Sequence, residues 1–238
     1  MKRFYKDAVV DAGEGGHRVL LDGKPMRTPA KSVLVVPSKP LAEAIAGEWR
    51  DVPEGSELNV AQLALTRLAA TGLDRVASQR DKVVEDTAKY GASDLLCYRA
   101  TEPESLVRRQ HEVWQPLLDW AKERYGADLA VASGLTFVSQ PNAALARLRR
   151  AVEAHSDMAL SALYNLTHIA GSLVIALAIA EQRLDAEQAF AAAQLDELYQ
   201  IERWGEDPLA TQRHAGIRKD MQAGARFLAL LGPARLRG

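Results

Sequence analysis

The most apolar stretch of the chain spans residues 163–180 and carries hydrophobic side chains on nearly every face of a helix. A helix with this pattern must be surrounded by protein on all sides. Its uninterrupted apolar run, residues 173–180, is far shorter than the roughly 20 residues needed to cross a bilayer, and polar residues such as Asn165 and His168 precede it. We therefore expect a buried central helix at about 160–180 in a soluble helical domain, with no membrane insertion.

The first forty residues predict strands, because short apolar runs alternate there with glycine-containing turns. Asp22-Gly23 is a strong signal for a two-residue hairpin, and Pro25 confines the return strand to a sheet edge. The segment Gly13-Glu14-Gly15-Gly16 is read as a turn between strands. These signals together predict a small antiparallel meander.

Helical spacing begins at Ser38, which is suited to cap a helix carrying Leu41, Ile45 and Trp49 on one face. An apolar stripe over residues 65–76 predicts another helix. Gly72 lies within that stripe, which suggests close approach to a neighbouring element rather than a break.

Helical spacing continues to residue 231, with capping patterns at Thr101 and Asp185. Pro116 predicts a kink or break in the helix that Gly126 ends, and residues 128–140 are read as a loop or a short extended piece. Further helices are expected at 142–152, 185–204 and up to Gly232-Pro233.

We therefore predict an α+β fold, with a small N-terminal antiparallel β-containing domain followed by a larger all-α helical domain. The first domain covers residues 1–80 and holds one or two helices; the second covers 81–238 and surrounds the helix at 160–180. Strands are confined to the first forty residues, so strands pairing with one another after Tyr90 would argue against this division.

Charge and cysteine usage narrow the functional classes. The 30 basic and 31 acidic residues nearly cancel, which gives no support to a nucleic-acid binder or a membrane-surface protein. Cys97 is the single cysteine, so an internal disulfide framework is excluded; its apolar neighbours favour a buried structural residue over a reactive thiol. A secretory signal peptide has an apolar segment after its basic residues, and none follows Lys2 and Arg3 here. We therefore expect a cytoplasmic protein.

Catalytic signatures are missing from the sequence. The pair Gly171-Ser172 falls inside the expected buried helix and so cannot form a nucleophile elbow. The five histidines are scattered, without zinc-ligand spacing, and His168 is expected to be a hydrogen-bonded core residue. We predict no catalytic residues, no metal and no cofactor.

Carboxylates gather around Trp204 at the predicted end of a helix. Such a cluster has three readings, which the residues alone leave open: plain surface, a protein-contact site, or, least favoured, the paired acids of a glycosidase. The acidic residues are Asp196, Glu197, Glu202, Glu206 and Asp207.

Six stretches, in order over nearly the whole chain, resemble the assembly-chaperone family of the ATP synthase catalytic head, the family that handles the α-subunit. The stretches are residues 3–6 (Arg-Phe-Tyr-Lys), 21–30 (Leu-Asp-Gly-Lys-Pro-Met-Arg-Thr-Pro-Ala), 41–49, 94–99 (Asp-Leu-Leu-Cys-Tyr-Arg), 114–120 (Trp-Gln-Pro-Leu-Leu-Asp-Trp) and 203–206 (Arg-Trp-Gly-Glu). None is decisive alone; their joint occurrence carries the resemblance.

The resemblance implies a non-enzymatic chaperone, of bacterial type and related to mitochondrial members, that binds unassembled α-subunit before it pairs with β. It places an acidic contact at Glu206, and less firmly at Asp207 because residues 208–211 depart from the family pattern. With Glu202, Trp204 and the aromatic candidates Trp114 and Trp120, these residues form the predicted partner-binding set. We expect a monomer, with a generic helical scaffold or, more weakly, a carboxylate-dependent hydrolase as alternatives.

Overall fold

The computed structural model describes residues 2–134, 136–205 and 207–237. The chain forms two compact units, each described by itself below. The first contains Met1–Val83, His155–Ala162 and Arg226–Gly238; the second contains Val84–Ala154 and Leu163–Ala225. The first unit thus gathers segments from both ends and the middle of the sequence. The predicted division at residue 80 stays a prediction.

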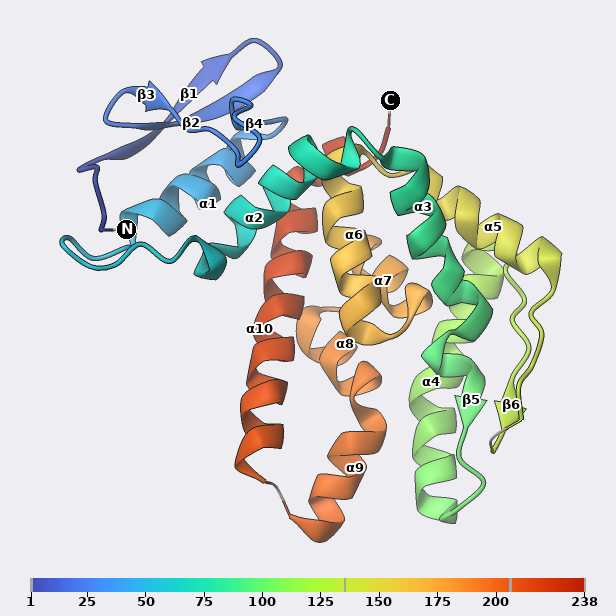
Figure 1. The fold of residues 1–238 in the computed structure, drawn as a ribbon. Coiled ribbons are helices and arrows are strands. Elements are labelled where there is room, and N and C mark those ends of the chain that lie inside the picture. The colour runs from blue at the N-terminus through green and yellow to red at the C-terminus, as the bar shows by residue number, and fades with distance from the viewer. Residues whose placement is uncertain (1, 135, 206, 238) are drawn as a thin grey trace. The chain divides into compact units, whose positions relative to one another are not determined.

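The first unit contains a small antiparallel sheet, as predicted (Figure 1). Its strands are β1 (Ala8–Gly13), β2 (Gly16–Leu21), β3 (Lys24–Pro25) and β4 (Val35–Val36), and β2 pairs with the other three. Asp22 and Gly23 join β2 to β3 with φ angles of 48° and 77°, the left-handed conformation that a tight hairpin turn needs. The hairpin prediction is confirmed.

Helix α1 (Lys39–Arg50) packs against this sheet through a face that includes Leu41, Ile45 and Trp49. Ser38 caps it, because its Oγ accepts a hydrogen bond from the Leu41 amide at 3.3 Å. Helix α2 (Ala64–Thr71) runs into a π-helical turn at Gly72–Val76. A Cβ on Gly72 would lie 3.0 Å from Met158 Sδ, so this glycine does permit close approach.

The remaining elements are helical apart from two short strands. The α-helices are α3 (Arg80–Ala88), α4 (Glu104–Tyr125), α5 (Asn142–Glu153), α6 (Asp157–Ala170), α7 (Leu173–Ala180), α8 (Ala186–Ala193), α9 (Leu195–Trp204) and α10 (Pro208–Leu231), with short 3₁₀ turns at Val60–Gln62, Lys89–Ser93, Leu95–Cys97 and Gly232–Arg235. No helix among the described residues is long and apolar enough to cross a membrane.

The single helix expected at 160–180 is two helices, α6 and α7. The chain breaks at Gly171, whose φ of 63° is left-handed, and Ser172 then caps α7 by accepting a hydrogen bond from the Ile175 amide at 3.1 Å. Gly171-Ser172 therefore lies between helices and not inside one. All eight residues of α7 are buried, as the apolar pattern predicted.

The prediction that strands stop within the first forty residues is wrong, and the strand pairing after Tyr90 that would argue against the division at residue 80 is present. Strand β5 (Tyr98–Arg99) pairs in parallel with β6 (Ala132–Ser133), and both belong to the second unit. Strands of two residues are too short to show an alternating pattern, which explains why the sequence did not reveal them. Of the range read as loop or extended, 128–140, only β6 is a strand among the described residues.

Helix ends show how far local signals reach. Pro116 lies inside α4, which continues to Tyr125 without a break, and Gly126 ends it with a φ of 70°. Pro103, without a side-chain cap, precedes α4 in place of the expected Thr101 cap. The Asp185 capping box is confirmed, but Gln194 divides the helix expected at 185–204 into α8 and α9.

Cys97 is fully buried in the second unit, as expected for a structural residue. Burial raises the pKa of its thiol to about 12, and the nearby Asp94 carboxylate adds to the increase. At neutral pH the thiol is therefore protonated.

Candidate functional site

The carboxylates around Trp204, which we call the acidic corner, lie near the point where α9 ends and α10 begins, at the lower end of both helices in Figure 1. We call the described residues of 201–210 the α9–α10 tip. Gly205 ends α9 with a φ of 87°. Asp207 then caps the start of α10, since its Oδ1 accepts hydrogen bonds from the amides of Leu209 at 2.8 Å and Ala210 at 3.0 Å.

Two large apolar side chains project from the tip into solvent. Trp204 is 77% exposed and Leu209 is 78% exposed, the two highest values among the exposed large hydrophobic residues. Single exposed apolar residues are common on proteins, but here an exposed indole and an exposed leucine lie five positions apart at one helix junction. Exposure of this kind is typical of a contact surface.

Glu202 forms the charged side of the tip together with basic residues. Its Oε1 lies 2.8 Å from Arg109 Nη1, and this hydrogen bond holds the pKa of Glu202 below its usual value. Arg203 donates a hydrogen bond to Ser105 Oγ at 3.0 Å and lies over the Tyr199 ring, 4.7 Å from its centroid. The tip therefore presents both signs of charge together with two exposed apolar side chains.

Glu197 lies one helical turn or more before the tip and is also engaged. Its Oε2 is 2.8 Å from His214 Nε2 and accepts a hydrogen bond from Arg213. Burial would raise the pKa of Glu197, but these two hydrogen bonds outweigh burial and lower it. A glycosidase needs a carboxyl group with a raised pKa as its acid. The pKa values of Glu197 and Glu202 are both lowered instead.

A hollow of about 500 Å³ lies beside Trp204. Its lining mixes the indole with aliphatic and charged side chains: Glu197, Gln200, Ile201, Trp204, Gly205, Asp207, Ala210 and Arg213. No group of His, Cys, Asp and Glu able to hold a metal ion occurs among the described residues. The arrangement suits contact with another protein better than bond-breaking chemistry.

Trp114 and Trp120 do not join the tip as exposed aromatics. Trp114 is fully buried, and its Nε1 donates a hydrogen bond to the Ala192 carbonyl at 2.8 Å. Trp114 is therefore a core residue and not the exposed partner-binding residue that we predicted. Trp120 is half-buried, and its ring meets Tyr125 edge-on at 5.5 Å. Glu206 lies outside the described residues, so its contact role stays a prediction.

His168 also departs from expectation, because its side chain is exposed and not in the core. Its Nδ1 lies 2.8 Å from the Tyr90 hydroxyl. The apolar faces of α6 are turned inward, and His168 occupies the remaining face near the helix end. A helix that is apolar on most sides still has room for one exposed position, which the pattern alone did not identify.

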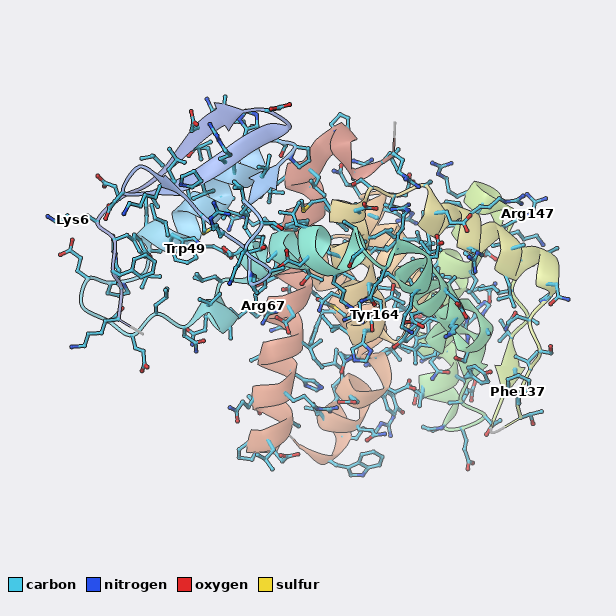
Figure 2. The ribbon with its side chains drawn as sticks, turned by 45° about the horizontal axis from the view of Figure 1, so that its top comes forward. Lys6, Trp49, Arg67, Phe137, Arg147 and Tyr164 are labelled. Carbon is cyan, nitrogen blue, oxygen red and sulfur yellow. The ribbon has the colours of Figure 1, made fainter. Side chains whose placement is uncertain are left out.

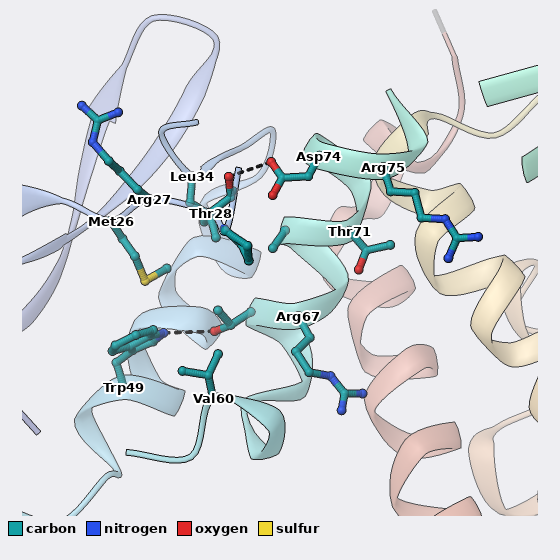
Figure 3. A pocket seen from close by; sticks show the side chains of 13 residues that line it. Met26, Arg27, Thr28, Leu34, Trp49, Val60, Arg67, Thr71, Asp74 and Arg75 are labelled. Atoms are coloured by element: carbon teal, nitrogen blue, oxygen red, sulfur yellow. Dashed lines mark hydrogen bonds between the residues drawn. The ribbon is translucent and has the colours of Figure 1, made fainter. Parts of the chain in front are cut away.

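A second hollow, of about 560 Å³, lies within the first unit (Figure 3) and was not predicted from the sequence. It is lined by Met26, Arg27, Thr28, Pro29, Leu34, Trp49, Val60, Thr66, Arg67, Ala70, Thr71, Asp74 and Arg75. Trp49 on α1 and Arg67 on α2 are labelled in Figure 2 as well. Residues 26–29 lie in a stretch that carried the family resemblance, which was the available signal.

Solved structures of other proteins have the same fold as this chain. The chain is similar to the crystal structure of Atp12 from Paracoccus denitrificans, with 40% identity and a TM-score of 0.90 over 96% of this chain and 97% of that one. A solved structure of a protein from Agrobacterium tumefaciens is 42% identical, with a TM-score of 0.91 over 97% and 86% of the two chains.

A more distant relative is the mitochondrial protein atp12 of Schizosaccharomyces pombe. It is 24% identical over 215 residues, which cover 86% of this chain and 74% of the relative. The family described as ATP12 chaperone protein matches residues 2–122. This match, with structural relatives at 40% identity over nearly the full length, shows that the chain belongs to the ATP12 chaperone protein family.

Proposed function

We propose that this chain binds the unassembled α-subunit of the ATP synthase before that subunit pairs with β. Its family membership makes it a chaperone of ATP synthase assembly. The choice of the α-subunit as client rests on the family resemblance of the six sequence stretches. The contact we assign to it is the α9–α10 tip.

The observation that carries this assignment is the exposure of Trp204 and Leu209 beside a charged rim. A subunit awaiting assembly exposes apolar surface that its neighbours will later cover, and such surface promotes aggregation. A chaperone must cover that surface reversibly, which requires an apolar anchor ringed by polar groups. The tip has both parts.

The proposal includes the absence of enzymatic activity and of a bound cofactor. It is supported by the engaged state of the carboxylates at the tip: Glu202 pairs with Arg109, Glu197 with Arg213, and Asp207 caps α10. We further infer a monomer that works in the bacterial cytoplasm, as suggested by the resemblance to bacterial family members.

Capture of purified α-subunit by the immobilised chain tests this function. Trp204→Ala should weaken capture, because it removes the larger of the two exposed apolar side chains of the tip. Phe137→Ala is the matched control, since Phe137 is 73% exposed in the same unit but lies before α5, away from the tip. Equal loss in both variants, or capture of unrelated unfolded proteins with the same affinity, would favour a generic scaffold.

A further inference from the structure

We propose that Arg109 of α4 is a positioning residue for client capture, which acts by holding Glu202 and the last turn of α9 in the orientation that leaves Trp204 free. The inference deepens the proposed function and rests on it, because it assumes that the α9–α10 tip is the client contact. It gives a role in capture to a residue that lies outside the tip.

The last turn of α9, residues 201–204, is held by polar contacts with α4. Glu202 Oε1 accepts a hydrogen bond from Arg109 Nη1 at 2.8 Å, and Arg203 Nη2 donates one to Ser105 Oγ at 3.0 Å. Among the residues that the structure describes, no other side-chain hydrogen bond or ion pair involves this turn. The polar anchors of the turn therefore all come from one neighbouring helix.

A buried tyrosine connects these contacts. Tyr199 lies on α9 before the last turn, and its hydroxyl is 2.5 Å from Ser105 Oγ. The guanidinium carbons of Arg109 and Arg203 lie 5.2 and 4.7 Å from the centroid of its ring, distances at which a cation is attracted to an aromatic face. We call these four residues and Glu202 the α4–α9 seam.

The charges of the seam make Arg109 the partner that Glu202 depends on. The hydrogen bond from Arg109, with the charges of Arg109 and Arg203, lowers the pKa of Glu202, so its carboxylate is ionised at neutral pH. Successive residues of a helix do not face each other, so Arg203 is poorly placed to replace Arg109 as the hydrogen-bond donor. Without Arg109, the Glu202 side chain loses its anchor.

The seam lies on a different face of α9 from the hollow of the tip. Trp204 comes five positions after Tyr199, which places it about 140° further round the helix. At helical spacings of three and four, Glu197, Gln200, Ile201 and Trp204 line the hollow. Contacts that fix the seam face therefore also fix the direction in which Trp204 points.

Holding the seam in advance should strengthen capture. Glutamate and arginine side chains have many rotamers, and a client that had to order them on binding would lose affinity to the entropy cost. In the free chain, Glu202 and Arg203 are already held by Arg109, Ser105 and Tyr199. Client binding at the tip then needs less ordering of these two side chains.

Biolayer interferometry with purified α-subunit and the full-length chain measures the effect. Arg109→Ala should bind about fivefold more weakly than the wild type, which corresponds to about 1 kcal/mol. Arg109→Lys keeps a cation beside Glu202 and should retain most of the affinity. Arg108→Ala is the matched control, because Arg108 is the preceding residue on α4, is 70% exposed and pairs with Glu112; its affinity should equal that of the wild type.

Two further measurements separate positioning from stability and from direct contact. In the background of Glu202→Ala, Arg109→Ala should cause no further loss of affinity, because Arg109 acts through Glu202. Hydrogen–deuterium exchange of the free chain should be faster at residues 200–205 in Arg109→Ala than in Arg108→Ala, with similar thermal midpoints for both.

Three results would overturn the inference. They are equal affinity of Arg109→Ala and the wild type, an equal loss from Arg109→Ala with and without Glu202, and unchanged exchange at residues 200–205. The equal loss would place Arg109 itself against the client. If the wild type captures α-subunit and Arg109→Ala captures it equally, this inference fails while the proposed function stands. If the wild type captures none, the proposed function fails and this inference with it.

Discussion

The carboxylate of Asp94 accepts a hydrogen bond from the backbone amide of Val174 at 3.1 Å, and so caps a helix that begins about 80 residues later in the chain. The other carboxylate oxygen accepts from the Leu96 amide, also at 3.1 Å. Asp94 is completely buried. One side chain thereby joins the segment that leads into β5 to the fully buried helix α7.

Asp94→Ala should destabilise the chain by about 2–4 kcal/mol, because it removes a helix cap and leaves two buried amides without an acceptor. Urea unfolding followed by circular dichroism measures the loss. Asp94→Asn keeps an acceptor oxygen and should cost clearly less. Equal stability of Asp94→Ala and the wild type would contradict the capping role.

Asp94 should also make the free energy of unfolding depend on pH. Burial raises the pKa of Asp94 to about 6, although hydrogen bonds from Ser172 and the Val174 amide oppose the rise. Since the folded-state pKa exceeds the unfolded one, the folded chain binds more protons between about pH 4 and 6. Its free energy of unfolding should therefore fall by about 2–3 kcal/mol, through Asp94 alone, as pH rises through this window. Above the window the contribution of Asp94 should change little.

Asp94→Asn removes that titration and serves as the reference. The difference in unfolding free energy between wild type and Asp94→Asn should vary from pH 4 to 6 and become constant above pH 7. A difference that stays constant over the whole range would show that Asp94 titrates normally.

Two glycines on α10 should respond oppositely to alanine. A Cβ on Gly224 would lie 2.8 Å from Leu166 Cδ2, whereas a Cβ on Gly216 would meet nothing within 4 Å. Gly224→Ala should therefore cost about 1–3 kcal/mol through overpacking, and Gly216→Ala should stabilise the helix by about 0.5–1 kcal/mol. Thermal or urea unfolding of both variants gives the comparison; the same sign for both would be inconsistent with these contacts.

Cys97 should resist alkylation in the folded chain. Its thiol is buried and its pKa is raised to about 12, so both access and thiolate are lacking at pH 8. Intact-mass measurement after iodoacetamide treatment should show slow native labelling that becomes fast in urea. Rapid labelling without denaturant, especially with loss of client capture, would reassign Cys97 as a reactive thiol.

Local signals in the sequence predicted most of the fold. The Asp22-Gly23 turn, the Ser38 cap and the Asp185 capping box each depend on residues a few positions apart, and each is confirmed. The β5–β6 pair was missed because two-residue strands have no readable period and depend on distant pairing. The cap that Asp94 provides for α7 depends on distant pairing too.

The site was less predictable than the fold. Trp204 could be placed at a helix end from the following glycine, and its exposure agrees with a contact role. Burial of Trp114 depends on packing near α8, to which its indole donates, and no spacing rule reports that. The hollow of the first unit combines residues from the β3 region, α1 and α2, so it exists only after folding.

The carboxylates of the acidic corner should contribute to capture without supporting the fold. Glu202→Gln should weaken capture of α-subunit, because it removes an exposed charge that pairs with Arg109. Capture by the variant should also depend less on salt concentration than capture by the wild type. Glu206→Gln is expected to act the same way. Circular dichroism and thermal midpoints should remain nearly unchanged, and wild-type capture by both variants would remove the acidic corner from the contact.

The most direct test of the central claim compares the affinity of the chain for isolated α-subunit with its affinity for the assembled ATP synthase head. Biolayer interferometry with the chain immobilised measures both. We predict clear binding of isolated α-subunit, weakened by Trp204→Ala but not by Phe137→Ala, and no measurable binding of the assembled head, because assembly buries the recognised surface. Equal affinity for the free and the assembled subunit would contradict the chaperone function that we assign.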